Sequence, residues 1–354
     1  MIKSKFNVIG VMSGTSLDGI DVVYVTFDYK NTWHFEIKHA ETMAYTYEWH
    51  QILKNLVSYS SEKLLQIDED YTVYLSHVIN NFIAKHNIKH LDAVCSHGHT
   101  ALHQPEKKLT YQIGNLADIA NLLNSTVVCD FRVQDVKFGG QGAPLVPIGD
   151  KLLFSEYDYC INLGGFANVS YKAENERIAF DICPTNIVLN HYVKQLGFDY
   201  DDEGKIASIG TINNTLLEQL NTLDFYKETP PKSLGLEWVN THIFPLIDAF
   251  NLEIKDILRT FVEHAAIQIA HIIGNDNQKT VLITGGGAYN RFFIERIKCH
   301  SKNKIVIPSK TIVEFKEALI FAFLGVLKLR GEINCLQSVT GAKKDHSSGK
   351  IYLP

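Results

Sequence analysis

The sequence predicts an α/β fold in two lobes of duplicated architecture. Apolar strands alternate with helical stretches along most of the 354 residues, which is typical of α/β proteins. A strand–turn–strand pattern at 7–27 occurs again at 158–171. Because 354 residues suit one large domain or two of ordinary size, we expect each lobe to contain one copy of this pattern.

The first half opens with a hairpin and continues as alternating helices and strands. Asp18-Gly19 lies between the two strands of 7–27, and both residues tolerate the positive φ of a tight turn. A loose apolar stripe predicts a long helix over 61–87. A strand, a short helix and a buried strand are then predicted at 91–98, 117–124 and 126–131.

A segment rich in glycine and proline separates the two halves. Residues 137–150 contain four Gly and two Pro, which makes this segment the best candidate for a domain boundary or hinge. We expect an N-terminal lobe of 1–136 plus 335–354 and a C-terminal lobe of 137–334.

The second half continues with the same kinds of element. Residues 177–182 predict a strand. The apolar residues from Ile257 to Ile272 follow one helical face. A buried strand within 280–287 leads into three glycines, and 317–332 predicts an apolar helix.

Composition and charge exclude several classes of function. A net charge of −5 indicates neither a nucleic-acid nor an anionic-membrane partner. No apolar run approaches the roughly 20 residues that span a bilayer. Gly10 and the polar residues 13–16 interrupt the N-terminal apolar stretch before it could act as a secretory signal, so we expect a cytoplasmic protein. The six cysteines form no CxxC pair and are expected to be buried free thiols.

Three glycine-rich turns, each after an apolar strand, suggest a phosphate site. They are Gly14-Thr15-Ser16-Leu17-Asp18-Gly19, then Gly164-Gly165, then Gly285-Gly286-Gly287. Glycine lets backbone N–H groups approach and surround an anion, and the hydroxyls of Ser13, Thr15 and Ser16 would add donors. A single such turn is also explained as a plain hairpin. The Rossmann and Walker patterns are absent from these turns, so the phosphate cradle would be of another kind.

Carboxylates beside these turns are the candidates for metal binding and for catalysis. Asp18 or Asp21 could hold Mg²⁺ directly or through water. Asp181 follows the strand that ends at Phe180 and precedes a Cys-Pro break, where a carboxylate facing a cleft could act as a general base. The alternative for Asp181 is a turn or helix-capping aspartate.

Arg132 and a group of histidines are further candidates. Arg132 follows a buried strand and could bind a substrate carboxylate in bidentate fashion, or it could form an ordinary ion pair. His97, His99 and His103 have no Cys, Asp or Glu at zinc spacing. We therefore expect them to bond the backbone or a polar substrate rather than a metal.

Taken together, these segments resemble the anhydro-N-acetylmuramic acid kinases, a family of the actin and hexokinase superfamily of ATPases. The resemblance covers nearly the whole chain, and the segment GVMSGTSLDGIDVV is its most specific part. The other motifs follow in family order: SHGHTALHQP, VCDFRVQDVKFGGQGAPLVP, INLGGFANVS, PPKSLGLEW, ITGGGAYN, KEALIFAFLG and SVTGA.

The resemblance implies a two-lobed actin-like ATPase with duplicated ribonuclease H-like domains and a central cleft for ATP and sugar. It places the nucleotide and catalytic motifs of 137–334 in the C-terminal lobe. It assigns ATP binding to Gly14–Asp21, which includes Ile20, and to the glycines of the two later turns. Asp181 matches the catalytic aspartate, and Arg132, Glu317 and His97 are expected to bind the sugar. A homodimer is also implied.

The implied reaction uses ATP with Mg²⁺ and water. The 6-hydroxyl of 1,6-anhydro-N-acetylmuramic acid is phosphorylated while water opens the anhydro bridge, and N-acetylmuramic acid 6-phosphate and ADP are formed during peptidoglycan recycling. Asp181 as a single base could serve both bond changes, because positioning and charge neutralisation supply most of the catalysis in phosphoryl transfer.

The sequence departs from the family pattern near the base and near the sugar. Cys183 and Thr185 stand where the family has glycines, His99 stands for a usual Gln, and Asn115 for a usual Asp. Two alternatives therefore stay open: a kinase of this family with a different amino sugar, or an actin-like nucleotide-binding module without catalysis. The retained Asp181 argues against the second alternative.

Overall fold

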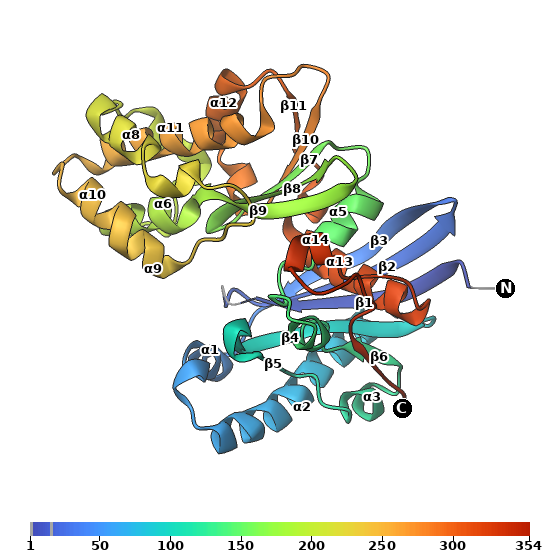
Figure 1. Ribbon diagram of the computed structural model, residues 1–354. Helices are drawn as coiled ribbons and strands as arrows, with labels where there is room; N and C mark the ends of the chain where they lie inside the picture. Colours follow the sequence, from blue (N-terminus) through green and yellow to red (C-terminus); the bar gives the residue numbers. More distant parts are fainter. Residues whose placement is uncertain (1–2, 15–16) are drawn as a thin grey trace. The chain divides into compact units, whose positions relative to one another are not determined.

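The computed structural model describes residues 3–14 and 17–354 of the chain (Figure 1). The chain divides into two compact units. The first unit contains the residues up to Leu153 and Phe315–Pro354, and the second contains Phe154–Glu314. In the described part of the chain, no helix combines the length and the apolar character that crossing a membrane requires.

A mixed sheet forms the centre of the first unit. Its strands run in the order β12-β6-β4-β1-β2-β3, and β5 pairs with β4. The strands are β1 (Lys5–Ser13), β2 (Ile20–Lys30), β3 (Thr32–Met43), β4 (Ala93–Gln104), β5 (Leu109–Ile113), β6 (Val127–Cys129) and β12 (Lys350–Tyr352). β1, β2 and β3 form an antiparallel meander, whereas β4 and β6 run parallel to β1.

The second unit repeats this arrangement. Its sheet has the order β11-β10-β7-β8-β9. The strands are β7 (Tyr159–Leu163), β8 (Phe166–Ala173), β9 (Glu176–Pro184), β10 (Thr280–Thr284) and β11 (Lys304–Val306). β7, β8 and β9 again form an antiparallel meander, with β10 and β11 parallel to β7. Both units therefore share a five-strand order of the ribonuclease H type, which confirms the predicted duplicated α/β fold.

Helices cover both faces of the first sheet. The helices of this unit are α1 (Tyr47–Lys54), α2 (Ser61–Lys85), α3 (Ile119–Leu123), α4 (Val133–Lys137), α5 (Pro147–Leu153), α13 (Lys310–Leu329, which begins in the second unit) and α14 (Gln337–Thr340). The predicted helix over 61–87 corresponds to α2, which Ser60 caps by accepting a hydrogen bond from the Lys63 N–H at 3.3 Å. Leu64, Tyr71 and Leu75 of α2 are buried with the apolar residues of one sheet face.

Helix α13 covers the opposite face of the first sheet (Figure 1). It approaches closely because glycines stand at the contacts. A Cβ on Gly10 of β1 would lie 2.2 Å from the carbonyl oxygen of Ala318, and one on Gly325 would lie 2.2 Å from the sulfur of Cys95. The backbone of β1 therefore rests directly on the helix that carries Glu317.

In the second unit, α11 (Ile254–Ile273) packs against β9 and supplies much of the core. The other helices of the unit are α6 (Asn186–Val193), α7 (Lys205–Ser208), α8 (Asn214–Asn221), α9 (Leu236–Trp238), α10 (Phe244–Asp248) and α12 (Arg291–His300). The predicted helical face from Ile257 to Ile272 lies within α11.

The bounds of the two units differ from the predicted lobes. Residues 137–153 and 315–334 belong to the first unit, and the chain crosses between the units after Leu153 and after Glu314. The glycines of 137–150 serve tight local turns instead. The Gln141 N–H, for example, donates to the Thr340 carbonyl at 2.8 Å, which ties this segment to the end of the chain.

Two smaller expectations can be compared with the structure. The hairpin of β1 and β2 is confirmed, but Leu17 rather than Asp18 takes the left-handed φ, at 61°, and Gly19 has a φ of 151°. All six cysteines are free, and all but Cys299 are buried. Sulfhydryl groups therefore contribute to the cores as small apolar side chains.

A buried ion cluster joins α11 to α12. Glu263 accepts hydrogen bonds from Arg259 at 2.6 Å, from Arg296 at 2.8 and 2.9 Å, and shares one with His300 at 2.7 Å. Burial raises the pKa of the Glu263 carboxyl, but the hydrogen bonds from Arg296, Arg259 and His300 outweigh this effect and bring the pKa to about 2. The folded state therefore holds Glu263 ionised more strongly than the unfolded chain does.

We predict that Glu263→Gln destabilises the protein by roughly 3 kcal/mol at pH 7, because each unit of pKa change corresponds to about 1.4 kcal/mol. Since the folded pKa is depressed, this stabilisation is present above the unfolded pKa of about 4.3 and is lost as the pH falls toward 2. Urea unfolding of both proteins between pH 7 and pH 3 measures the difference. A difference that stays constant over this range would contradict the assignment.

Candidate active site

The predicted phosphate loop of the first unit follows the end of β1. Thr15 and Ser16 lie outside the described residues. Asp18 is exposed, whereas Gly19 and Ile20 are buried where β2 begins. Asp21 lies on β2, and its Oδ1 accepts a hydrogen bond from the Thr42 hydroxyl at 2.5 Å. The loop thus presents Asp18 to solvent beside the anchored carboxylate of Asp21.

The Ser13 hydroxyl lies among polar side chains of the first unit. It is buried at the end of β1 and lies 2.5 Å from the Tyr45 hydroxyl, 2.8 Å from the Tyr71 hydroxyl and 2.8 Å from Nδ1 of His99. Burial lowers the pKa of His99 to about 4, so this ring is neutral at pH 7. In the structure the Ser13 hydroxyl contacts these three side chains at the end of the strand that leads into the loop, and its role as a phosphate donor stays a prediction.

Arg132 is held on two sides by neutral acceptors. Its Nε–H donates to Nε2 of His97 at 2.8 Å, and its Nη1–H donates to the Gly142 carbonyl at 2.6 Å. The His97 Nδ1–H donates in turn to the Gly98 carbonyl at 2.8 Å. Burial and the charge of Arg132 lower the pKa of His97 well below its usual value, which keeps Nε2 free to accept.

Glu317 interacts electrostatically with Arg132. Desolvation raises the pKa of the Glu317 carboxyl, and the charges of Arg132 and Lys316 oppose that rise. Glu317 nevertheless stays exposed to solvent. The His97 ring packs against Phe321, one turn further along α13, with the ring centroids 4.6 Å apart. The structure therefore brings together the three predicted sugar-binding residues, His97, Arg132 and Glu317.

Asn115 and His99, two of the departures from the family pattern, both lie close to these residues. The Asn115 side-chain amide donates to the His97 carbonyl at 3.1 Å. Its Oδ1 is buried and has no hydrogen-bond partner in the part of the chain that the structure describes. A buried acceptor without a donor is costly, so this oxygen can receive a hydrogen bond from a polar ligand.

The two glycine turns of the second unit lie side by side. They follow β7 and β10, which are parallel neighbours, so their carboxyl ends meet at one edge of the sheet. Gly285 has a φ of 82°, and a Cβ there would lie 2.5 Å from Oδ1 of Asn162. A Cβ on Gly287 would lie 2.7 Å from the Cβ of Leu163. By contrast, a Cβ on Gly286 would meet no atom within 4 Å.

Thr185 fastens the first of these turns. Its hydroxyl donates to the Gly164 carbonyl at 2.8 Å and lies 3.2 Å from the Gly165 carbonyl, which also accepts the Thr185 N–H at 2.8 Å. Its φ is −137°, and Cys183 likewise does not adopt a positive φ. The glycines expected from the family pattern are therefore not needed for backbone freedom in this chain.

We had predicted that Asp181 ends its strand, but β9 continues to Pro184 and Asp181 lies within it. It pairs with Asn168 of β8, and its N–H donates to the Lys232 carbonyl at 3.2 Å. Its Oδ2 accepts the Leu234 N–H at 2.8 Å, while no residue in the described part of the chain bonds its Oδ1. Desolvation raises the pKa of Asp181, and the Leu234 hydrogen bond opposes this rise.

Sequence reasoning did not identify the loop that holds Asp181. Residues 230–238 were noted as a family motif, yet nothing in their composition indicates that Lys232 and Leu234 contact Asp181. These contacts use backbone atoms, which leave no signal in residue type. Tyr45 and Tyr71 were missed for another reason, because they are distant from Ser13 in sequence and resemble ordinary core aromatics.

The carboxylates of Asp18 and Asp21 fit Mg²⁺ in their chemical type. This ion prefers oxygen ligands and keeps several of its waters, which can bridge it to a carboxylate. Asp18 is exposed, and Asp21 accepts a hydrogen bond from the Thr42 hydroxyl.

Two units with the same sheet order, each with a glycine-containing turn after a central strand, define a duplicated α/β fold of the ribonuclease H type. A family model described as "Anhydro-N-acetylmuramic acid kinase" matches residues 6–354. A curated relative of that name from Crocosphaera subtropica is 32% identical and aligns over 98% of this chain and 98% of its own. One from Xylella fastidiosa is 33% identical over 97% of this chain and 95% of its own. The chain belongs to the anhydro-N-acetylmuramic acid kinase family, a family of ATP-using sugar kinases.

Solved structures show more distant similarities. The activator of the 2-hydroxyisocaproyl-CoA dehydratase from Clostridium difficile, with bound ADPNP, is 15% identical with a TM-score of 0.44, over 92% of this chain and 95% of that chain. A ROK family glucokinase from Streptomyces griseus, in complex with glucose and AMPPNP, is 12% identical with a TM-score of 0.40, over 90% of this chain and 98% of that chain.

We predict that Thr185→Val lowers the free energy of unfolding by about 1 kcal/mol, because the Gly164 carbonyl loses its hydroxyl donor. Thr185→Ser keeps the hydroxyl and should retain most of the stability. Urea denaturation of the three proteins measures the effect. A Thr185→Val variant as stable as the wild type would show that the hydroxyl donor does not stabilise this turn.

Proposed function

We propose that this chain uses ATP to convert 1,6-anhydro-N-acetylmuramic acid into N-acetylmuramic acid 6-phosphate and ADP, with water opening the anhydro bridge. This reaction would serve the recycling of peptidoglycan. Family membership supports the class of reaction. The observation that carries the chemistry is the carboxylate of Asp181, which is anchored through one oxygen while the other oxygen has no hydrogen-bond partner among residues 3–14 and 17–354.

Asp181 would act as the general base toward water. Its Oδ1 accepts a proton from the water, whose oxygen forms a bond to C1 of the sugar. The C1–O bond of the bridge breaks, and its electron pair stays on the bridge oxygen at C6. That oxygen then attacks the γ-phosphorus of ATP, and the P–O bond to ADP breaks. The raised pKa of Asp181 favours this role, since a stronger base accepts the proton more readily.

The phosphates of ATP would lie against Gly14–Asp21, Gly164-Gly165 and Gly285–Gly287. Backbone N–H groups at such turns stabilise the charge that spreads over the transferring phosphoryl group. Asp18 or Asp21 would hold Mg²⁺, which supplies charge neutralisation to the phosphates.

Arg132, Glu317 and His97 would bind the sugar. Arg132 has its Nε–H and Nη1–H committed to the protein, and the remaining face of the guanidinium suits a carboxylate. Both ring nitrogens of His97 are bonded, so His97 would contribute by holding Arg132. Glu317 would accept hydrogen bonds from sugar hydroxyls.

A second candidate is a kinase of the same family that acts on a different amino sugar. His99 and Asn115 favour it, because both depart from the family pattern close to His97. A kinase assay against a panel of amino sugars, with mass detection of the products, separates the two candidates. We also infer from the family that the protein is a cytoplasmic homodimer. Light scattering after gel filtration tests whether it is a dimer.

We predict that Gly286→Val weakens ATP binding by tenfold or more while leaving the thermal unfolding midpoint nearly unchanged. The reason is that a Cβ at Gly286 would meet no atom within 4 Å, so the side chain would occupy space that the proposed ATP phosphates need. Calorimetric titration with a non-hydrolysable ATP analogue measures the affinity. Binding as tight as in the wild type would remove this turn from the ATP site.

We predict that Asp181→Asn lowers the rate of product formation by roughly 10²–10⁴-fold while ATP and sugar still bind. The reason is that the amide keeps the shape of the carboxylate but cannot accept the proton. Single-turnover assays in ¹⁸O-labelled water should show that both label incorporation and phosphorylation are lost. For the wild type, the rate should fall on the acid side with an apparent pKa above the usual aspartate value of about 3.9. Near-normal rates in Asp181→Asn would leave Asp181 only a structural role.

A further inference from the structure

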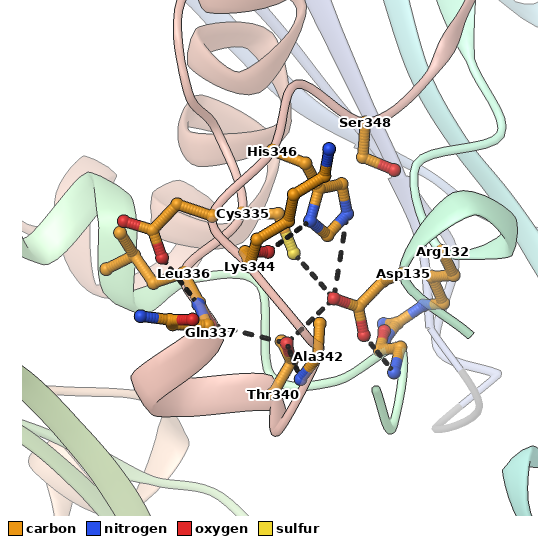
Figure 2. A network of polar contacts seen from close by, with 12 residues as sticks. Arg132, Asp135, Cys335, Leu336, Gln337, Thr340, Ala342, Lys344, His346 and Ser348 are labelled. Atoms are coloured by element: carbon orange, nitrogen blue, oxygen red, sulfur yellow. Dashed lines mark hydrogen bonds and ion pairs between the residues drawn. The ribbon is translucent and has the colours of Figure 1, made fainter. Parts of the chain in front are cut away.

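The first unit contains a buried carboxylate that the proposed reaction does not use. Asp135 of α4 is fully buried. Its Oδ1 accepts the Thr340 hydroxyl at 2.7 Å and the Cys335 thiol at 3.0 Å, and its Oδ2 accepts the Gly142 N–H at 2.7 Å. Figure 2 shows Asp135 between the C-terminal segment and the residues beside Arg132. One carboxylate therefore joins three separate parts of the chain.

The same residues could be interpreted as a metal site. Asp135, Cys335 and His346 each bring one ligand atom to within 4.8 Å of the others. Structural zinc requires four ligands and a thiolate. Here Asp135 Oδ1 already accepts two hydrogen bonds, and burial together with Asp135 raises the pKa of the Cys335 thiol, which keeps it protonated as a donor. These contacts favour a hydrogen-bonded hub over a metal centre.

The hub leads directly to Arg132. Asp135 holds the N–H of Gly142, and the carbonyl of the same Gly142 accepts the Nη1–H of Arg132 at 2.6 Å. Gly142 has a φ of 71°, a conformation that glycine adopts without strain. Because Asp135 determines where this glycine lies, it also determines where the carbonyl that orients the guanidinium lies.

The C-terminal segment determines in turn how Asp135 is oriented. Cys335 and His346 form an antiparallel bridge through two backbone hydrogen bonds of 3.1 Å. Thr340 ends α14, and its carbonyl accepts the Gln141 N–H at 2.8 Å. Gly140 packs so closely against the carboxylate that a Cβ there would lie 2.2 Å from Oδ2. A larger residue than glycine at position 140 would therefore displace the carboxylate.

We propose that Asp135 is a positioning residue for Arg132, through which the segment 335–346 sets the orientation of the guanidinium toward an acidic sugar. This proposal rests on the proposed function, because it takes the carboxylate of the sugar as the ligand of Arg132. Three donors surround Asp135, so the site requires an acceptor at both oxygens. An amide at this position would set its NH₂ group against at least one of these donors.

Steady-state kinetics of Asp135→Asn, Asp135→Ala, Arg132→Ala and the double variant Asp135→Ala/Arg132→Ala test the proposal. Asp135→Ala should raise KM for the sugar roughly ten- to hundredfold, the equivalent of one or two hydrogen bonds to a charged group, with KM for ATP little changed. Asp135→Asn should lie between the wild type and Asp135→Ala. In the Arg132→Ala background, Asp135→Ala should have almost no further effect on KM for the sugar, because its partner is gone.

Asp201→Asn is the matched control. Asp201 is also a buried carboxylate, but it accepts the N–H groups of Ile206 and Ala207 at 2.8 and 2.9 Å in the second unit. This variant should lose stability without a change in KM for the sugar. Additive effects in the double variant, or equal increases in KM for sugar and ATP, would overturn the positioning role. Stoichiometric zinc in the purified wild type would also overturn it.

A second measurement does not depend on the substrate. In protein labelled with ¹⁵N-arginine, the Nε–H of Arg132 should exchange slowly with solvent, because His97 holds it. The variant Arg132→Lys identifies the Arg132 signal, because that signal disappears. Exchange of this Nε–H should become faster in Thr340→Val and in Asp135→Ala, but not in Thr340→Ser. Unchanged exchange in Asp135→Ala would overturn the proposal even if the kinase assay succeeds. Faster exchange with no turnover of the anhydro sugar would support the positioning and reject the proposed substrate.

Discussion

Parallel pairing of the central strands is the constraint on which the chemistry of both units depends. In the first unit β1 and β4 are parallel neighbours, and in the second unit β7 and β10 are. Parallel neighbours end at the same edge of a sheet, so residues that are far apart in sequence meet where the strands stop. In the first unit, Ser13 at the end of β1 pairs with His99 of β4, and in the second unit the two glycine turns lie side by side.

A second theme is the use of neutral hydrogen-bonding groups to hold charged side chains. Arg132 donates to an uncharged imidazole and to a carbonyl rather than to a carboxylate of the protein. Its charge is therefore not neutralised by these contacts and remains available to an anion, with Glu317 nearby. Asp181 is held in a similar way, since a backbone N–H orients its carboxylate without neutralising the negative charge. The fold orients both groups and leaves their reactivity in place.

Several particulars were inaccessible to sequence reasoning because backbone atoms or distant partners decide them. The glycine- and proline-rich stretch 137–150 has the composition of a hinge, yet its turns wrap around Asp135 and belong to the first unit. Ser13 has the composition of a phosphate donor, yet Tyr45, Tyr71 and His99 surround its hydroxyl. These three partners lie tens of residues away along the chain.

The sequence by itself determined the α/β class, the duplication, the long helices and the family, because periodicity and motif order are local properties of the chain. It also singled out Arg132, Asp181, Glu317 and the glycine turns. Only the tertiary structure decided which oxygen of Asp181 is held, which donors surround Asp135, and that Thr185 fastens a glycine turn. These features arise from side chains and backbone groups that meet after folding, and hydrogen-bond partners of that kind have no sequence period from which they could be predicted.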